Sequence, residues 1–108
     1  MKENLDNFKK LVSDKKSGWL DKAIWREENE VWLDKSAKIA IRILREIRLQ
    51  KNNGMTQRKL ADALNVSAQY INKVVKGNEN LTLETISKIE QVLDITLIEI
   101  PGFKTSIS

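Results

Sequence analysis

The stretch TQRKLADALNVSAQYINKVVKG, residues 56–77, predicts two short helices joined by a tight turn. Thr56 is a residue type suited to capping the first helix, and Leu60, Ala61 and Leu64 follow at helical spacing, so they share one face. Asn65 comes next, and asparagine tolerates the left-handed backbone conformation that ends a helix abruptly. The first helix is therefore expected to stop at Asn65.

The second predicted helix has one apolar face and one polar, positively charged face. Ser67 is expected to cap it, Ile71, Val74 and Val75 face back toward the first helix, and Gly77 ends it. The residues left on its outer side are Ala68, Gln69, Asn72, Lys73 and Lys76. These side-chain types can contact base edges and phosphates.

This pattern resembles the helix-turn-helix of the lambda-repressor/Cro-like (XRE) family of bacterial and phage regulators. The residues that carry the resemblance are Gln57, Leu60, Ala61, Leu64, Val66, Ser67, Ile71 and Val74, followed by KGNENLTLETISKIEQVLDI. The similarity extends from about Ala37 to Ile95. Two positions depart from the family pattern: Asn65 stands where glycine is usual, and Ala68 stands where a long polar residue is common.

The expected fold is all-α, a lambda-repressor-like helix-turn-helix bundle with an N-terminal helical extension and a short C-terminal β-strand. The extension covers residues 1–34, the DNA-binding domain residues 35–94, and the strand and tail residues 95–108. The strand is predicted at ITLIEI, residues 95–100, because the segment is rich in β-branched residues and stops at Pro101.

Two helices are expected in the extension, one from Leu5 to Lys16 and one from Trp19 through WREENE. The three tryptophans, Trp19, Trp25 and Trp32, all lie in this third of the chain. One interpretation is that they fill a small core, and the other is that they form a protein-binding surface, since aromatic residues concentrate at interfaces.

The main domain is expected to open with a helix from Ser36 to about Lys51, whose inward stripe is Ala40, Ile43, Leu44 and Ile47, widened by Ile39 and Ile41. A basic stripe of Lys35, Lys38, Arg42 and Arg45 runs along the same helix. It could be a solvated face, lie along phosphates, or receive an acidic protein partner. Thr82 is expected to cap a later helix, whose apolar face is formed by Leu83, Ile86, Ile89, Val92 and Leu93.

Positive charge is concentrated around the motif. The chain of 108 residues has a net charge of +4, yet residues 35–54 alone hold six Lys/Arg and one Asp/Glu, a net of +5. A polyanion would therefore meet this region first.

The resemblance and the side-chain chemistry together give candidate DNA contacts. Gln57, at the start of the first helix of the motif, occupies a position that commonly binds a phosphate in the family. Amide side chains can pair with adenine, lysine can reach guanine, and a methyl group can contact thymine. The base-reading candidates are Ala68, Gln69, Asn72 and Lys73. The backbone-contacting candidates are Gln57, Ser67, Tyr70, Lys76 and Asn78.

The composition argues against an enzyme. The chain has no Cys and no His, which removes the disulfide framework, thiolate metal sites and the commonest general base. No P-loop, GxGxxG or metal-ligand cluster appears, so neither a cofactor nor a metal is expected. No apolar run approaches the roughly 20 residues of a membrane span, and a cytoplasmic location is expected.

The function expected from the resemblance is sequence-specific binding of double-stranded DNA by a homodimeric transcriptional regulator, acting as a repressor through the helix Ser67–Lys76. The alternative is an antitoxin of the HigA type, which autoregulates its operon and neutralises a toxin protein through a separate surface. A third interpretation is a protein-interaction adaptor in which the motif no longer binds DNA.

Overall fold

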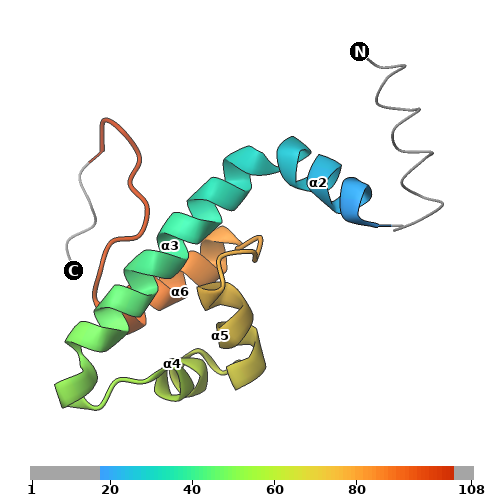
Figure 1. The fold of residues 1–108 in the computed structure, drawn as a ribbon. Coiled ribbons are helices and arrows are strands. Elements are labelled where there is room, and N and C mark those ends of the chain that lie inside the picture. Colours follow the sequence, from blue (N-terminus) through green and yellow to red (C-terminus); the bar gives the residue numbers. More distant parts are fainter. Residues whose placement is uncertain (1–17, 104–108) are drawn as a thin grey trace, which may run out of the picture. The chain divides into compact units, whose positions relative to one another are not determined.

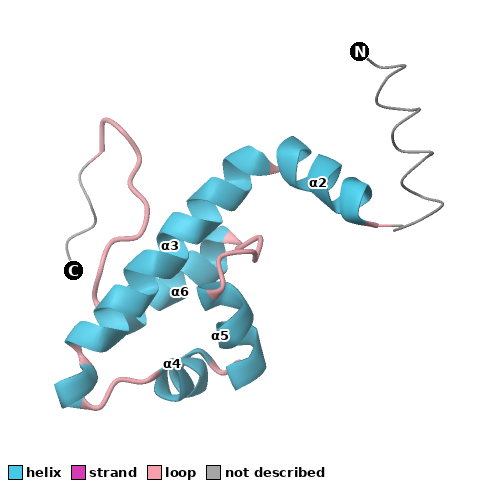
Figure 2. Ribbon diagram, viewed as in Figure 1, coloured by secondary structure: helices cyan, strands magenta, loops and turns pink. Residues whose placement is uncertain are grey.

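The computed structural model describes residues 18–103 and shows five α-helices and one short 3-10 helix in that range (Figures 1 and 2). They are α2 (Trp19–Glu28), α3 (Glu30–Leu49), η1 (Lys51–Asn53), α4 (Gln57–Leu64), α5 (Ala68–Val75) and α6 (Leu83–Leu93). The contacts divide the chain into two units, residues 1–31 and residues 32–108. The helix predicted from Leu5 to Lys16 lies outside the described residues.

Within the first unit, the segment predicted to be helical from Trp19 onward forms α2. The helix ends at Asn29, whose backbone N–H and side-chain amide both donate to the Trp25 carbonyl, the amide over 2.7 Å. Trp19 and Trp25 are 49% and 48% exposed, so they are surface residues and do not fill a core. Their role as a protein-binding surface stays a prediction.

α3 supplies the long helix that was expected, but Ser36 does not open it. The helix already begins at Glu30, and Ser36 lies within it, 4% exposed. Its hydroxyl donates to the backbone carbonyl of Glu79 over 2.8 Å. The serine therefore serves a tertiary contact and caps nothing. Ile41 and Leu44, expected on the inward stripe, are exposed.

The core lies where α3, α4, α5 and α6 meet. Helix α4 packs against both α5 and α6. Ala61 is 1% exposed, as expected of a small residue where two helices cross close to a turn. The buried cluster consists of Ile39, Ile43, Leu60, Ala61, Leu64, Ile71, Val74, Ile86, Ile89 and Leu93. This packing fixes the helix-turn-helix against the rest of the unit.

The predicted C-terminal β-strand at residues 95–100 is wrong. Residues 18–103 contain no strand, so this segment has nothing there with which to form a ladder. Its backbone is held instead by Glu90, whose carboxylate accepts the N–H of Leu97 over 2.6 Å and of Ile98 over 3.2 Å. Ile95 and Leu97 pack against the buried cluster. The β-branched and apolar residues here thus reflect packing of an irregular segment, which a pattern of residue types does not distinguish from strand pairing.

Candidate nucleic-acid interface

The first helix of the motif, α4, begins as the sequence predicts. Thr56 has an extended backbone, and its side-chain oxygen accepts the Lys59 N–H over 3.0 Å. Gln57 and Arg58 lie before Lys59 in the first turn of α4. A helix offers no intrahelical acceptor for the backbone N–H groups at these positions. The positive end of the helix dipole adds to them, so this terminus can donate hydrogen bonds to an anion.

The turn between α4 and α5 is closed by left-handed backbone at Asn65. Its φ is 59° and its ψ is 43°. The N–H groups of Asn65 and Val66 donate to the carbonyls of Asp62 and Ala61 over 3.1 and 3.0 Å. The end of α4 is therefore satisfied within the motif itself, and Asn65 does what glycine does at such a position.

The second helix, α5, is capped by Ser67, whose hydroxyl oxygen accepts the Tyr70 N–H over 3.0 Å. Ile71 is 0% exposed and Val74 is 1% exposed, so one face belongs to the core. The opposite face carries the exposed residues Ala68, Gln69, Asn72, Lys73 and, just beyond the helix, Lys76. At 3.6 residues per turn these five positions lie on one side of the helix. All four base-reading candidates are thus accessible and adjacent.

The backbone candidates surround that face. Ser67, which precedes α5, and Asn78, which follows it, are both exposed, while Tyr70 and Gln57 are half-buried. Gln57 lies on α4 and not on α5, so the candidate surface is contributed by both helices of the motif. Arg58, which the sequence pattern does not mark as a candidate, is exposed next to Gln57 in the first turn of α4.

The end of α5 is held by a contact that the sequence analysis missed. Gly77 has φ 83°, and a Cβ built on it would lie 3.0 Å from the Cα of Ala37 in α3. Two residues further on, Glu79 receives the hydrogen bond from Ser36. We refer to these contacts as the α3 clamp, formed by Ser36, Ala37, Gly77 and Glu79. It fixes the loop that carries Asn78.

A second link joins the C-terminal ends of α3 and α6. The side-chain amide of Gln50 donates to the Leu93 carbonyl over 2.8 Å and to the Glu46 carboxylate over 2.9 Å. Glu46 also pairs with Arg42 over 2.8 Å. Hydrogen bonds from Gln50 and Arg42 lower the pKa of Glu46 below its ordinary value of 4.5. The carboxylate is therefore held in its charged form.

Two further features of the described residues bear on function. None of their helices combines the length and the apolar character needed to cross a membrane. Within the same part of the chain, no group of three or more acidic side chains is arranged to hold a metal ion.

Comparisons with known proteins point to the same segment. The family model described as helix-turn-helix, HTH_3, matches residues 44–100, which include every candidate DNA contact. Control protein C.BamHI of Bacillus amyloliquefaciens is 36% identical over 62 residues, an alignment that covers 57% of this chain and 75% of that protein. No solved structure gives a significant match.

Proposed function

The chain belongs to the helix-turn-helix family and is a sequence-specific DNA-binding regulator of transcription, and on that premise we propose that it represses transcription by reading an operator with α5. One observation carries the proposal. The exposed face of α5 consists of alanine, amide and lysine side chains, while its other face is buried in the core. A helix with that division can enter the major groove without disturbing the fold.

Each exposed residue of α5 has a role that follows from its chemistry. Gln69 and Asn72 would pair with adenine N6 and N7, and Lys73 with guanine O6 and N7. Ala68 offers only a methyl group, so it would contact a thymine methyl. Specificity would therefore rest on the two amides and the lysine.

The backbone contacts would place α5 in register. The free N–H groups at the start of α4, together with Gln57 and Arg58, suit one phosphate. Ser67 accepts from Tyr70 in the cap, which leaves its hydroxyl proton for a second phosphate. Tyr70, Lys76 and Asn78 would contact the backbone on the other side of the recognition face.

A single unit of this size reads few base pairs and makes few phosphate contacts, which gives weak, salt-sensitive binding. We therefore propose a homodimer on a pseudo-palindromic site, with half-sites about 34–36 Å apart. The N-terminal extension or the C-terminal segment would form the interface. Because a repressor acts where the chromosome is, the proposed location is cytoplasmic.

The name of the relative, a control protein, supports a regulatory role in place of the antitoxin alternative. The comparisons give no support to a toxin partner. The family is one of DNA-binding regulators. That the chain is not an enzyme is part of the proposal, and the lack of Cys and His in the sequence supports it.

The test is binding of the protein to the DNA upstream of its own gene, measured by fluorescence anisotropy over a salt series. We expect tight binding that resists random competitor DNA. Gln69→Ala or Lys73→Ala should cost about 1–3 kcal/mol of binding free energy. Gln91→Ala changes an exposed polar residue on α6 and is the matched control. Equal affinity for random DNA, or equal loss in the control, would contradict the proposal.

A further inference from the structure

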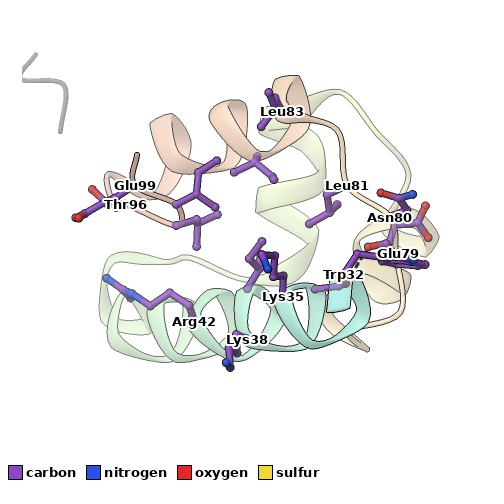
Figure 3. Close-up of a pocket in the computed structure, with 15 residues that line it drawn as sticks. Trp32, Lys35, Lys38, Arg42, Glu79, Asn80, Leu81, Leu83, Thr96 and Glu99 are labelled. Atoms are coloured by element: carbon purple, nitrogen blue, oxygen red, sulfur yellow. Dashed lines mark hydrogen bonds between the residues drawn. The ribbon is translucent and has the colours of Figure 1, made fainter. Parts of the chain in front are cut away.

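A hollow that takes no part in the proposed DNA contacts lies between α3, the start of α6 and the segment that follows α6 (Figure 3). Its volume is about 660 Å³. We call it the α3–α6 groove. Side chains of Ile39, Ile86 and Leu97 line it, and two further apolar residues at its margin remain exposed, Leu83 at 70% and Ile98 at 42%. The groove thus offers an apolar surface that residues 18–103 leave uncovered.

One long edge of the groove is cationic. Lys35, Lys38 and Arg42 lie along α3, and Figure 3 shows them in a row on the same helix. Both side chains of the ion pair between Lys38 and Asp34 are exposed, so the pair contributes little to stability. Lys38 can therefore exchange Asp34 for another carboxylate. Arg42 lies seven positions after Lys35 along the helix, a rise of about 10 Å, which equals two turns of a partner helix.

The carboxylates of the groove are found elsewhere. In Figure 3, Glu79 lies at the end near Trp32, and Glu99 lies at the other end, near Arg42. Positive charge therefore lies along the α3 edge, where Lys38 is paired with Asp34 and Arg42 with Glu46, and negative charge lies at the two ends. A partner that fits must bring apolar side chains for the floor and negative charge for the α3 edge.

We propose that the α3–α6 groove binds an acidic amphipathic helix of another protein. Apolar residues at i, i+3 or i+4, and i+7 of that helix would fill the apolar floor. Glutamate or aspartate along one side of its apolar face would lie against Lys35 and Lys38, since Arg42 is already paired with Glu46. The regulator would in this way dock a protein partner through a surface distinct from the one that reads DNA.

Nucleic acid does not suit this groove, because phosphates and sugars would cover the cationic edge and leave the apolar floor exposed. A second copy of the chain suits it poorly for another reason. In a two-fold contact of the groove with itself, the same surface patch appears on both sides. The cationic edges of the two copies would then lie in one interface, where like charges oppose association.

The groove leaves α4 and α5 free, since no residue of either helix lines it. The proposed base-reading face and the groove are thus built from different residues. DNA and the partner helix should therefore bind to the same molecule at once.

The test uses the full chain and a fluorescein-labelled helical peptide of about 15 residues, with leucines on one face and glutamates beside them. A twin peptide carries lysine in place of each glutamate. We expect the acidic peptide to bind at least about tenfold more tightly than its twin. Binding should weaken about tenfold in Lys35→Glu/Lys38→Glu and in Leu83→Ser, and persist when the upstream DNA is added at saturation.

The matched control is Lys51→Glu/Lys88→Glu, which makes the same change of charge at exposed positions outside the groove. Circular dichroism establishes that all variants are folded. The proposal is overturned if the twin peptide binds equally well, if the control weakens binding as much as the groove variant, or if DNA displaces the peptide. It is also overturned if light scattering shows a dimer that Leu83→Ser converts to a monomer, because a second copy would then occupy the groove.

Discussion

The two helices of the motif end in the same region of backbone conformation, but for different reasons. α4 stops at Asn65, with φ 59°, an exposed side chain and hydrogen bonds made within the motif. α5 stops before Gly77, with φ 83°, where the backbone lies so close to Ala37 that a Cβ would be 3.0 Å from its Cα. The first ending is local, while the second is a tertiary contact.

The difference shows how the recognition helix is held. The turn at Asn65 sets the angle between α4 and α5, and the α3 clamp sets where the far end of α5 lies on the bundle. The first turn should therefore tolerate substitution, whereas the second should not.

Gly77→Ala should destabilise the fold most, by about 3 kcal/mol, because it combines left-handed strain with a clash against α3 backbone. Gly54→Ala is the matched control. Its φ is 89°, but the nearest atom is the flexible end of Lys59, so only about 1 kcal/mol of strain is expected. Urea denaturation measures both. Equal losses would mean that the contact with Ala37 adds nothing.

Ser36→Ala should cost about 2 kcal/mol, because it leaves the carbonyl of Glu79 without the hydroxyl that donates to it in a part-buried setting. Affinity for operator DNA should fall as well, since the loop with Asn78 loses an anchor. Ser87→Ala, at an exposed position on α6, should change neither quantity. If the two alanine variants behave alike, the clamp does not depend on this hydrogen bond.

Asn65→Ala should cost about 1 kcal/mol, because alanine resists left-handed backbone. Asn65→Gly should leave stability unchanged or raise it slightly, since glycine adopts this conformation without a steric penalty. Thermal unfolding of the two variants and of the parent protein checks this expected order of stabilities. A large loss in Asn65→Gly would show that the amide side chain makes a contribution of its own.

The smallest effect concerns pH. The pKa of Glu46 is lowered from 4.5 in the folded state, so its charged form contributes stability at neutral pH. That contribution is lost as the pH falls below 4.5 and through the lower pKa that Glu46 has in the folded state. Glu46→Gln should therefore flatten the acid side of a plot of Tm against pH. Parallel curves for parent and Glu46→Gln would contradict the assignment.

The same division between local and distant contacts explains what the sequence could predict. Thr56, Ser67 and Thr82 were expected to cap helices, and each accepts the N–H three residues ahead. Such bonds depend only on neighbouring residues. Exposure of the α5 face likewise follows from helical periodicity, so that exposure could be predicted from the sequence alone.

Features that depend on distant residues were missed or wrong. The strand at residues 95–100 was predicted from residue types, but a strand also needs a partner, and Glu90 takes up its N–H groups instead. Ser36 looked like a helix start, yet it lies within α3 and donates to Glu79. The α3–α6 groove arises only when α3, α6 and the C-terminal segment come together.

The division of α5 into a buried and an exposed face also bears on how such a regulator could diversify. Ile71 and Val74 hold the helix, while Ala68, Gln69, Asn72 and Lys73 are exposed. Under the base-reading roles proposed for them, changes at these four positions should alter DNA preference with little loss of stability, since surface substitutions usually stay within about 0.5 kcal/mol. A gene library randomised at these four codons should yield mostly folded proteins. Duplicated copies could then drift to new operators without first passing through unfolded intermediates.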